Sequence, residues 1–305
     1  MSYTTALCFA HHMGLYMVER NFASNLRGLI QTSPRYVDSE FIPGKLQQEM
    51  LNLEPIAESR GLYGLTSNGI GIIPIMGLMT KGGSKFGTST NEARRALSQA
   101  VNDPNVKAIM LHMDTPGGSF AGTDEFANDV YAASQIKPLA AHGDDLVASA
   151  GMYVASQAPR FTMNKSGEAG SIGTYAVVED SSGAAEMAGV KVHLVSTGEM
   201  KGFGADGVEI TEQQLSRFKE MVNNAQTFFS SAIQTGRNLT AAQVKSLVDD
   251  GGVYFAKDAK AKGLIDAVES YDVALEKLAS RIKTPRMNSA RRALAIADKS
   301  NRLTS

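Results

Sequence analysis

The sequence lacks the features of a disulfide-bonded, metal-binding or strongly charged protein. Cys8 is the only cysteine in 305 residues, which excludes an intramolecular disulfide and fits a reducing compartment. The five histidines show no HExxH-type spacing and there is no cysteine cluster, so we expect neither a metal nor another cofactor. The formal net charge of −1 provides no overall field that would attract nucleic acid.

A clear membrane segment is also lacking. Residues 4–17 are fairly apolar, but His11, His12 and Gly14 interrupt them and no basic region precedes them. A signal peptide needs a positive first region and a cleaner apolar run, and a membrane span needs about 20 apolar residues. We therefore expect no membrane anchor and a cytoplasmic location.

The chain is long enough for a full core with appendages, and 43% hydrophobic and 20% charged residues are ordinary for a globular protein. Residues 1–65 predict an N-terminal helical extension, with helical stretches near 14–31 and 43–58. Residues 66–282 form the expected main domain. In residues 283–305 basic residues outnumber acidic ones, which is typical either of a solvated, disordered tail or of a basic arm that docks on a partner.

Apolar runs alternate with helical patterns from residue 70 onward. Strands are predicted at 70–77, 106–113, 138–142, 161–164, 176–178 and 190–195. Helices are predicted at 88–101, 123–134, 148–158, 184–189, 211–236, 240–248, 256–263 and 268–281. The helix at 211–236 begins with a capping box, Thr211 followed by Gln214. This alternation indicates βαβ units, an α/β architecture and a largely parallel sheet.

Two short segments point to chemistry. Residues 147–153 (VASAGMY) place Ser149 among small residues at the start of an apolar helix, and residues 196–202 (STGEMKG) place Lys201 in a glycine-flanked loop after a strand. A serine hydroxyl is a weak nucleophile until a base takes its proton. A lysine can be that base if burial lowers its pKa towards neutrality. If Ser149 and Lys201 meet in space, they form a Ser-Lys variant of the serine-hydrolase scheme.

Five ordered segments together resemble the SppA-type serine peptidases, the signal peptide peptidase A family, which includes phage prohead peptidases. They are residues 114–118 (DTPGG), 148–153 (ASAGMY), 170–174 (GSIGT), 197–201 (TGEMK) and 252–255 (GVYF). Each is weak alone, but their order and spacing make the resemblance specific over roughly residues 70–267. The resemblance implies a Clp/crotonase-like spiral fold of repeated ββα units with a largely parallel sheet, plus helical N- and C-terminal extensions.

The resemblance also implies three catalytic roles. Ser149 matches the family's nucleophile, Lys201 its general base, and Ser171 the serine that holds the lysine in place by a hydrogen bond. Each residue type also has a plain structural explanation. Ser149 could be a small packing residue, Lys201 a solvated loop lysine and Ser171 a serine in a glycine-flanked turn.

The glycines near the end of one predicted strand match the family's oxyanion hole. By resemblance the backbone N–H groups of Gly118 and Ala150 stabilise the oxyanion, and such donors contribute roughly 3–4 kcal/mol each. Gly117 and Gly151 are expected beside them, in contact with substrate. A Pro-Gly-Gly turn that simply closes a strand is the alternative explanation.

The same residues bear on other kinds of active site. The related Clp-type peptidases share the expected fold class but use a histidine base, and a resemblance to them would place that histidine about 25 residues after Ser149, where residues 164–178 contain none. We therefore expect His142 to be a strand-end residue that lines the cleft. A crotonase-like enzyme that binds acyl-CoA would not need the pairing of Ser149 with Lys201. A catalytically silent assembly or scaffold protein with the same fold remains an alternative.

The resemblance implies the partners as well. The expected substrate is a peptide or unfolded protein, held along a strand edge. The family forms rings, and in some members the base reaches the nucleophile across a subunit boundary, so we expect a homo-oligomer. The expected role is phage head maturation on capsid or scaffold protein, in the host cytoplasm or the procapsid interior. A bacterial cytoplasmic peptidase resembling signal peptide peptidases is the alternative.

Overall fold

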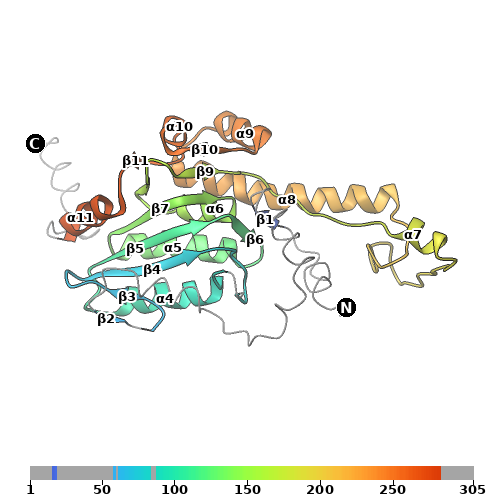
Figure 1. Ribbon diagram of the computed structural model, residues 1–305, viewed down its shortest axis with the longest axis horizontal. Coiled ribbons are helices and arrows are strands. Elements are labelled where there is room, and N and C mark those ends of the chain that lie inside the picture. Colours follow the sequence, from blue (N-terminus) through green and yellow to red (C-terminus); the bar gives the residue numbers. More distant parts are fainter. Residues whose placement is uncertain (1–15, 19–57, 60, 84–86, 283–305) are drawn as a thin grey trace, which may run out of the picture.

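A largely parallel sheet forms the centre of the computed structural model (Figure 1). Strands β4 (Ile70–Met76), β5 (Ala108–Thr115) and β7 (Leu139–Ala148) are neighbours and parallel. Strand β7 also pairs in parallel with β8 (Phe161–Met163) and, closer to its end, with β9 (Glu168–Gly170). The predicted α/β architecture with a largely parallel sheet is confirmed. The structure describes residues 16–18, 58–59, 61–83 and 87–282.

Short strands extend this sheet. Strands β2 (Glu58–Ser59) and β3 (Gly64–Leu65) form an antiparallel pair beside β4. On the other side, β10 (Val253–Phe255) pairs antiparallel with β9, and β11 (Ala267–Val268) pairs in parallel with β8. The result is a mixed sheet with a parallel centre. A separate two-stranded sheet joins β1 (Tyr16–Val18) to β6 (Gly117–Ser119).

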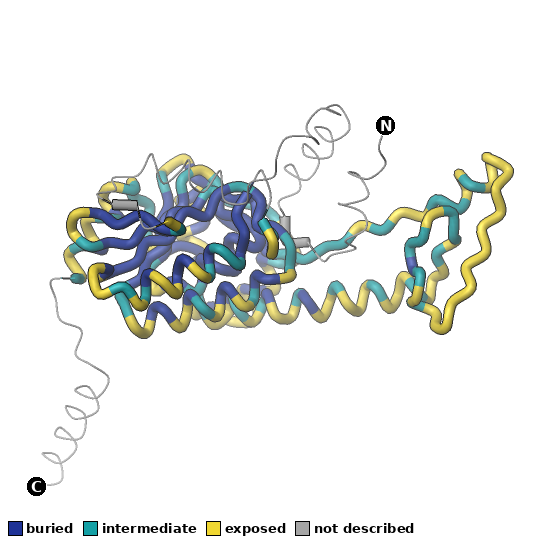
Figure 2. The backbone as a smooth tube through the Cα atoms, turned by 90° about the horizontal axis from the view of Figure 1, so that it is seen from below, coloured by how far each residue is buried: buried dark blue, intermediate teal, exposed yellow. Residues whose placement is uncertain are grey.

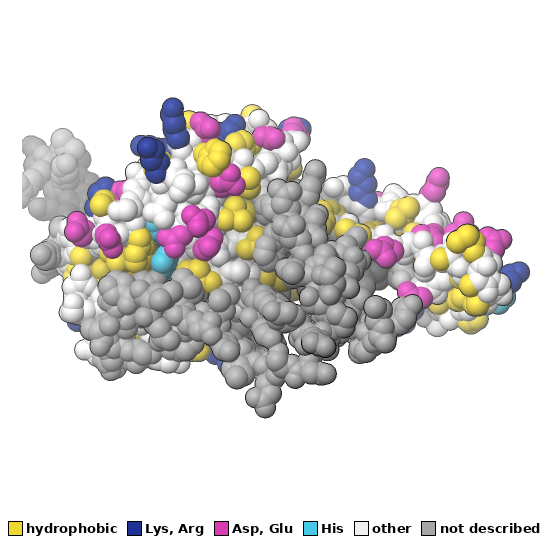
Figure 3. Space-filling model, viewed as in Figure 1, with side chains coloured by type: hydrophobic (Ala, Val, Ile, Leu, Met, Phe, Trp, Pro, Cys, Tyr) yellow, Lys and Arg dark blue, Asp and Glu magenta, His cyan; other side chains and the backbone are white. Residues whose placement is uncertain are grey.

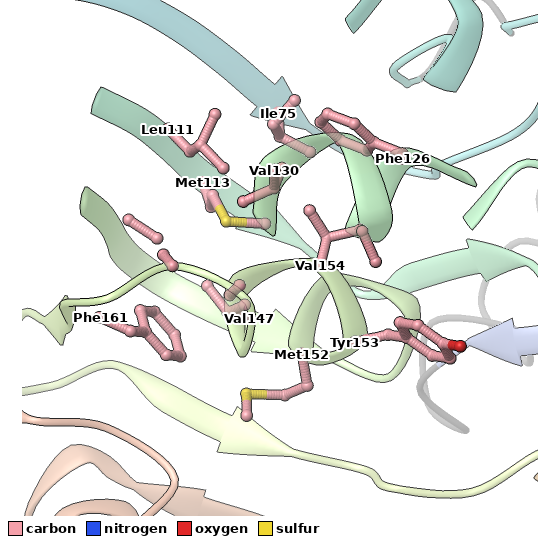
Figure 4. Close-up of a cluster of buried hydrophobic side chains, with 14 of the residues drawn as sticks. Ile75, Leu111, Met113, Phe126, Val130, Val147, Met152, Tyr153, Val154 and Phe161 are labelled. Atoms are coloured by element: carbon pink, nitrogen blue, oxygen red, sulfur yellow. The ribbon is translucent and has the colours of Figure 1, made fainter. Parts of the chain in front are cut away.

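Helices cover both faces of the sheet because the buried strands present apolar side chains on both sides. Helices α4 (Thr90–Asn102), α5 (Thr123–Ile136) and α6 (Ala150–Ala155) contribute to the larger core. Figure 4 shows this cluster around the strands and α6. Helix α11 (Tyr271–Ile282) packs on the opposite face against alternate residues of β4 and β5. The residue alternation along each strand therefore separates two cores.

A long helix carries an arm, residues 176–211, away from the body (Figure 2). Helix α8 (Glu212–Arg237) begins at the predicted capping box, in which Thr211 and Gln214 bond each other's backbone. Its buried residues Ala225, Phe229 and Ile233 all lie in its second half. Its first half extends beyond the sheet and supports α7 (Ser182–Met187) and the loops around it (Figures 1 and 2). Helices α9 (Ala241–Asp250) and α10 (Ala256–Ala261) follow near the body.

Some predicted elements differ from the structure. Residues 176–178 and 190–195 form no strand, because a strand needs a neighbour for its backbone and these segments have none in the described part of the chain. Tyr16–Val18 is a strand, although a helix was predicted there. The rest of the predicted helical stretches, and the tail at 283–305, lie outside the described residues. Within the part that is described, none of the helices combines the length and apolar character needed to cross a bilayer.

Candidate active site

Ser149 lies at a sharp junction between a strand and a helix. Strand β7 ends at Ala148 and α6 begins at Ala150, so one residue makes the turn. Its φ of 54° and ψ of −115° are unusual for a residue with a side chain. Its N–H donates to the Gly170 carbonyl at 2.9 Å, and its own carbonyl accepts from the Tyr153 N–H at 3.0 Å. The backbone is therefore held from both sides, which fixes the direction of the side chain.

The Ser149 hydroxyl is buried without a partner. The residue is 0% exposed, and its Oγ makes no hydrogen bond to any residue that the structure describes. It does not cap α6 either. Buried hydroxyls nearly always find a partner, and leaving one unpaired costs about 1–3 kcal/mol. A strained and unsatisfied serine is a feature of functional sites rather than of packing residues.

The structure places Ser171 next to Ser149. Strands β7 and β9 are parallel, and Ala148 is the register partner of Gly170. The residues that follow, Ser149 and Ser171, therefore lie side by side where the two strands end. Ser171 also has a positive φ, 53°, and its N–H donates to the Gly252 carbonyl at 2.6 Å.

Two glycines, Gly117 and Gly118, begin strand β6, which α6 contacts. Gly117 has a φ of 99°, and its N–H donates to Thr115 Oγ1 at 3.1 Å. Its carbonyl accepts from the Met79 N–H at 2.8 Å, and the Ser119 N–H donates to the Met79 carbonyl at 2.8 Å. A Cβ on Gly118 would lie 1.7 Å from that carbonyl oxygen, so no side chain fits there. Because backbone groups alternate along a strand, the N–H and carbonyl of Gly118 point to the other edge of β6.

Helix α6 lies close to β5 and β6. A Cβ on Gly151 would lie 2.6 Å from Thr115 Cγ2, so the absence of a side chain lets the helix approach. Ala150 and Gly151 are buried, as are Gly117 and Gly118, and α6 contacts β6. The structure therefore brings these four predicted residues together around the Ser149 junction.

Lys201 lies on the arm. Its side chain is exposed, and its N–H donates to the Gly198 carbonyl at 2.9 Å in a tight turn. The turn is attached to the start of α8, because Gln214 Nε2 donates to the Glu199 carbonyl at 2.5 Å. The rings of Phe203 and Phe218, with centroids 5.0 Å apart, hold the next part of the loop on the same helix.

Lys201 and Ser149 lie far apart within one chain. Tyr153, on α6, stacks on Phe229 of α8 with ring centroids 5.1 Å apart. Residues 198–201 are called the lysine loop. Gln214, which bonds this loop, lies near the other end of the same unbroken helix. An α-helix rises about 1.5 Å per residue, so the two points on α8 are about 22 Å apart. The structure does not bring the predicted base to the predicted nucleophile of its own chain.

His142 is not the base of Ser149. It is fully buried, its Nδ1 lies 2.8 Å from Thr162 Oγ1, and its Nε2 lies 3.3 Å from Asn164 Oδ1. Burial lowers its pKa from 6.5 to about 4, so it is neutral at physiological pH. The expectation that it lines the cleft is wrong, because its side chain faces inward from β7 and contacts the Tyr271 ring at the start of α11.

A second histidine was missed by the sequence analysis. His112 Nε2 and Asp144 Oδ2 are 2.6 Å apart, and the His112 ring stacks on Tyr271. His112 and His142 are register partners on β5 and β7. Two histidines at corresponding positions of neighbouring predicted strands were the available signal. These contacts give the two histidines a structural role, on the face of the sheet that α11 covers.

Comparisons with known proteins add independent findings. The family model of Peptidase family S49 matches residues 131–284. The chain is 29% identical to "Capsid assembly protease C" of Escherichia phage lambda, over 72% of this chain and 52% of that protein. It is 26% identical to "Serine protease SPPA, chloroplastic" of Arabidopsis thaliana, over 53% of this chain and 24% of that protein. The chain thus spans about half the length of the first relative and a quarter of the second.

Among solved structures, the chain is similar to the ClpP protease catalytic domain from Plasmodium falciparum. The sequence identity is 12% and the TM-score is 0.43, over 77% of this chain and 95% of that one.

Proposed function

Because this chain belongs to peptidase family S49, we propose that it is a serine endopeptidase that hydrolyses peptide bonds in extended segments. The observation that carries the proposal is the Ser149 junction. A serine with a strained backbone and an unpartnered, buried hydroxyl lies at the start of α6, which contacts the glycines of β6. This is what an acyl-transfer site requires of its own chain.

The proposed mechanism uses Ser149 as nucleophile and Lys201 as general base. Lys201 Nζ takes the proton of Ser149 Oγ as the oxygen attacks the peptide carbonyl. The N–H groups of Gly118 and Ala150 bind the oxyanion, and the lysine then protonates the leaving amine. Water, deprotonated by the same lysine, releases the acyl group and restores the serine. Ser171, beside Ser149, orients the lysine by a hydrogen bond.

Lys201 is proposed to come from a neighbouring copy of the chain. The lysine loop lies about 22 Å along α8 from the contact of that helix with α6, which is too far for proton transfer. A base supplied by a second copy resolves this, because a projecting arm can reach the body of its neighbour. The catalytic unit is then a homo-oligomer, and a ring is the closed assembly expected of one repeated head-to-tail contact.

The surface of the arm supports this assembly. Hydrophobic side chains gather at the end of the arm (Figure 3). Val195 is 95% exposed and Met187 is 88% exposed, and the other exposed apolar residues of the arm are Val177, Val190, Val192 and Leu194. An apolar patch of this kind on a projecting element is typical of a protein interface. We assign its occupant as a second copy, since that contact would also complete the active site.

The proposed substrate is capsid or scaffold protein during head maturation, with action in the host cytoplasm or inside the procapsid. The support is the name of the relative from phage lambda, a capsid assembly protease. A bacterial cytoplasmic protease resembling signal peptide peptidases is the second candidate, supported by the name of a relative from Enterococcus faecium, "Putative signal peptide peptidase SppA", which is 26% identical over 60% of this chain and 53% of that protein. In both cases the bound segment is an extended peptide.

The test is intact mass over time, with casein as unfolded substrate, for the wild type, Ser149→Ala, Lys201→Ala and Lys191→Ala. Lys191 is an exposed lysine of the same arm and serves as the matched control. We expect cleavage by the wild type and Lys191→Ala, and none by the other two, with unchanged thermal unfolding in all four. Cleavage by well-folded Ser149→Ala would overturn the assignment, and no cleavage by any of them would favour an assembly protein.

A further inference from the structure

The strand that carries the proposed oxyanion donor already has a peptide strand on its edge. Strand β1 pairs antiparallel with β6, and the register partners are Tyr16 with Ser119, Met17 with Gly118, and Val18 with Gly117. This is the only contact of β1 within either sheet of the described structure. The segment reaches β6 from about a hundred residues earlier in the sequence, so the pairing is not a local hairpin.

The alternation of backbone groups shows which bonds β1 makes. The Gly117 carbonyl and the Ser119 N–H both point to Met79. The N–H and carbonyl of Gly118 therefore point to the opposite edge, where Met17 is the register partner. In an antiparallel pair, a residue in this position exchanges both hydrogen bonds with its partner. The Gly118 N–H, the proposed oxyanion donor, thus faces the backbone of Met17.

We propose that Tyr16–Val18 is a tethered strand that occupies the place of the peptide substrate. An extended substrate on a sheet edge is held by main-chain hydrogen bonds, and β6 offers one free edge for them. Strand β1 uses that edge, in the antiparallel direction, with Met17 opposite the proposed oxyanion donor. Ser149 Oγ is itself buried, as expected if the substrate site beside it is occupied. The inference rests on the proposed function, because it takes the edge beside Ser149 to be the substrate site.

The consequence is competition within one molecule. A strand on the same chain has an effective concentration that a free peptide reaches only at about millimolar levels. If β1 is seated nine-tenths of the time, the apparent affinity for a peptide falls about ten-fold. Peptides then bind only when they displace β1. A change that unseats β1 without touching β6 is expected to open the site.

Two proline substitutions in β1 test whether its pairing with β6 blocks peptide binding. Met17→Pro removes the N–H that faces the Gly118 carbonyl, whereas Val18→Pro removes an N–H that points away from β6. Proline at position 18 also favours the extended conformation at position 17. Both changes are made in the full-length Ser149→Ala protein, so that bound peptide is not cut. The probe is a fluorescein-labelled peptide with the sequence of residues 12–22, and the readout is fluorescence anisotropy.

We expect the Met17→Pro protein to bind the peptide about ten-fold more tightly than its parent, and the Val18→Pro protein to bind like the parent. Hydrogen exchange gives a second readout. The Gly118 amide should be protected in the parent and in Val18→Pro, exposed in Met17→Pro, and protected again when peptide is added.

Equal affinity of all three proteins, or no binding by any of them, would overturn the proposal. Neither measurement depends on catalysis. If the wild type cuts nothing but Met17→Pro still binds peptide more tightly, the proposed function fails and the tethered strand stands. If the wild type cuts casein and the three affinities are equal, the reverse holds.

Discussion

At Gly118, the absence of a side chain is a requirement of the backbone. A Cβ there would lie 1.7 Å from the Met79 carbonyl oxygen, and backbone cannot rotate away as a side-chain end can. We expect Gly118→Ala to lower the free energy of unfolding by about 1–3 kcal/mol, the usual cost of overpacking. Peptidase activity should fall as well, because β6 must shift and carry the Gly118 N–H with it. Urea unfolding and casein cleavage measure the two effects.

Gly173→Ala is the matched control for this change. A Cβ on Gly173 would have no heavy atom within 4 Å, and the φ of this residue is not in the positive range that disfavours side chains. The variant should therefore unfold at the same urea concentration as the wild type. Similar unfolding midpoints for Gly118→Ala and the wild type would contradict the close approach of Met79 to β6.

His142 makes the stability depend on pH. The unfolded chain takes up a proton on this histidine near pH 6.5, but burial lowers its pKa to about 4 in the folded protein. Between these values the unfolded state binds more protons, so acid favours unfolding. Stability should be full above pH 6.5 and should fall as the pH approaches 4, by about 3 kcal/mol from this group. The Asp144 carboxylate, the nearest opposing charge, only partly offsets the effect of burial.

The measurement is urea unfolding from neutral pH to about pH 4, for the wild type, His142→Gln and His193→Gln. Glutamine at 142 removes the titration, so the pH dependence should flatten even though the protein is less stable at neutral pH. His193 is exposed on the arm, and its replacement should leave the wild-type slope unchanged. Equal slopes in the wild type and His142→Gln would contradict the assignment.

The sequence predicted some of these residues and not others, for physical reasons. Ser149 and Gly118 could be named because their short segments match a family pattern, and their catalytic roles stay predictions. His112 and its bond to Asp144 were missed, since they depend on the register of two strands about 30 residues apart. The position of Met17 opposite Gly118 could not be found, because nothing near either residue specifies a partner about a hundred positions away.

Among the elements, two helices begin with the same capping box but differ in what it holds. Thr211 with Gln214 starts α8, and Thr240 with Gln243 starts α9. Only Gln214 also bonds the lysine loop, through the Glu199 carbonyl. We expect Gln214→Ala to lower kcat/KM by about ten- to a hundred-fold, since misplacing a catalytic group by about 1 Å can have that effect. Cleavage kinetics on casein measure it.

The Gln243→Ala variant separates the loop from the cap. Each substitution removes one capping box, and each should cost about 1 kcal/mol of stability. Only Gln214→Ala should lower kcat/KM, because the cap of α9 bonds no part of the lysine loop. An equal loss of activity in both variants would mean that the activity follows stability and not the position of Lys201.

Elements were predictable where the chain supplies their partners. The run at 70–77 became β4 because β3 and β5 lie on its two sides. The alternating pattern at 190–195 has the same strand signal, yet the segment remains unpaired on the arm. Alternation records which face of a segment is apolar, but not whether a neighbouring strand exists. A neighbour from a second copy would be invisible to a pattern within one chain.

In the whole molecule, the spacing of the dyad in the sequence does not set its spacing in space. Ser149 lies between β7 and α6, and Lys201 is on an arm whose reach is set by α8. The sequence predicted both α8 and the two motifs. It could not predict which end of the helix would pack on the body, because that depends on the Tyr153 and Phe229 contact.

Mixing two inactive variants tests the shared site. Ser149→Ala keeps the base and Lys201→Ala keeps the nucleophile, so neither should cleave casein alone. If the dyad joins two copies, a mixed oligomer contains sites with both groups intact. Random pairing at a head-to-tail interface would restore about a quarter of the wild-type activity.

The two proteins are dissociated in mild urea, combined in equal amounts, reassembled and assayed. The control replaces Lys201→Ala by the double variant Ser149→Ala/Lys201→Ala, which supplies no serine and should restore nothing. A mixture that stays inactive, although light scattering shows mixed oligomers, would mean that Lys201 does not act across the interface. The arm would then have to bend back to its own Ser149, and α8 would have to break between Gln214 and Phe229.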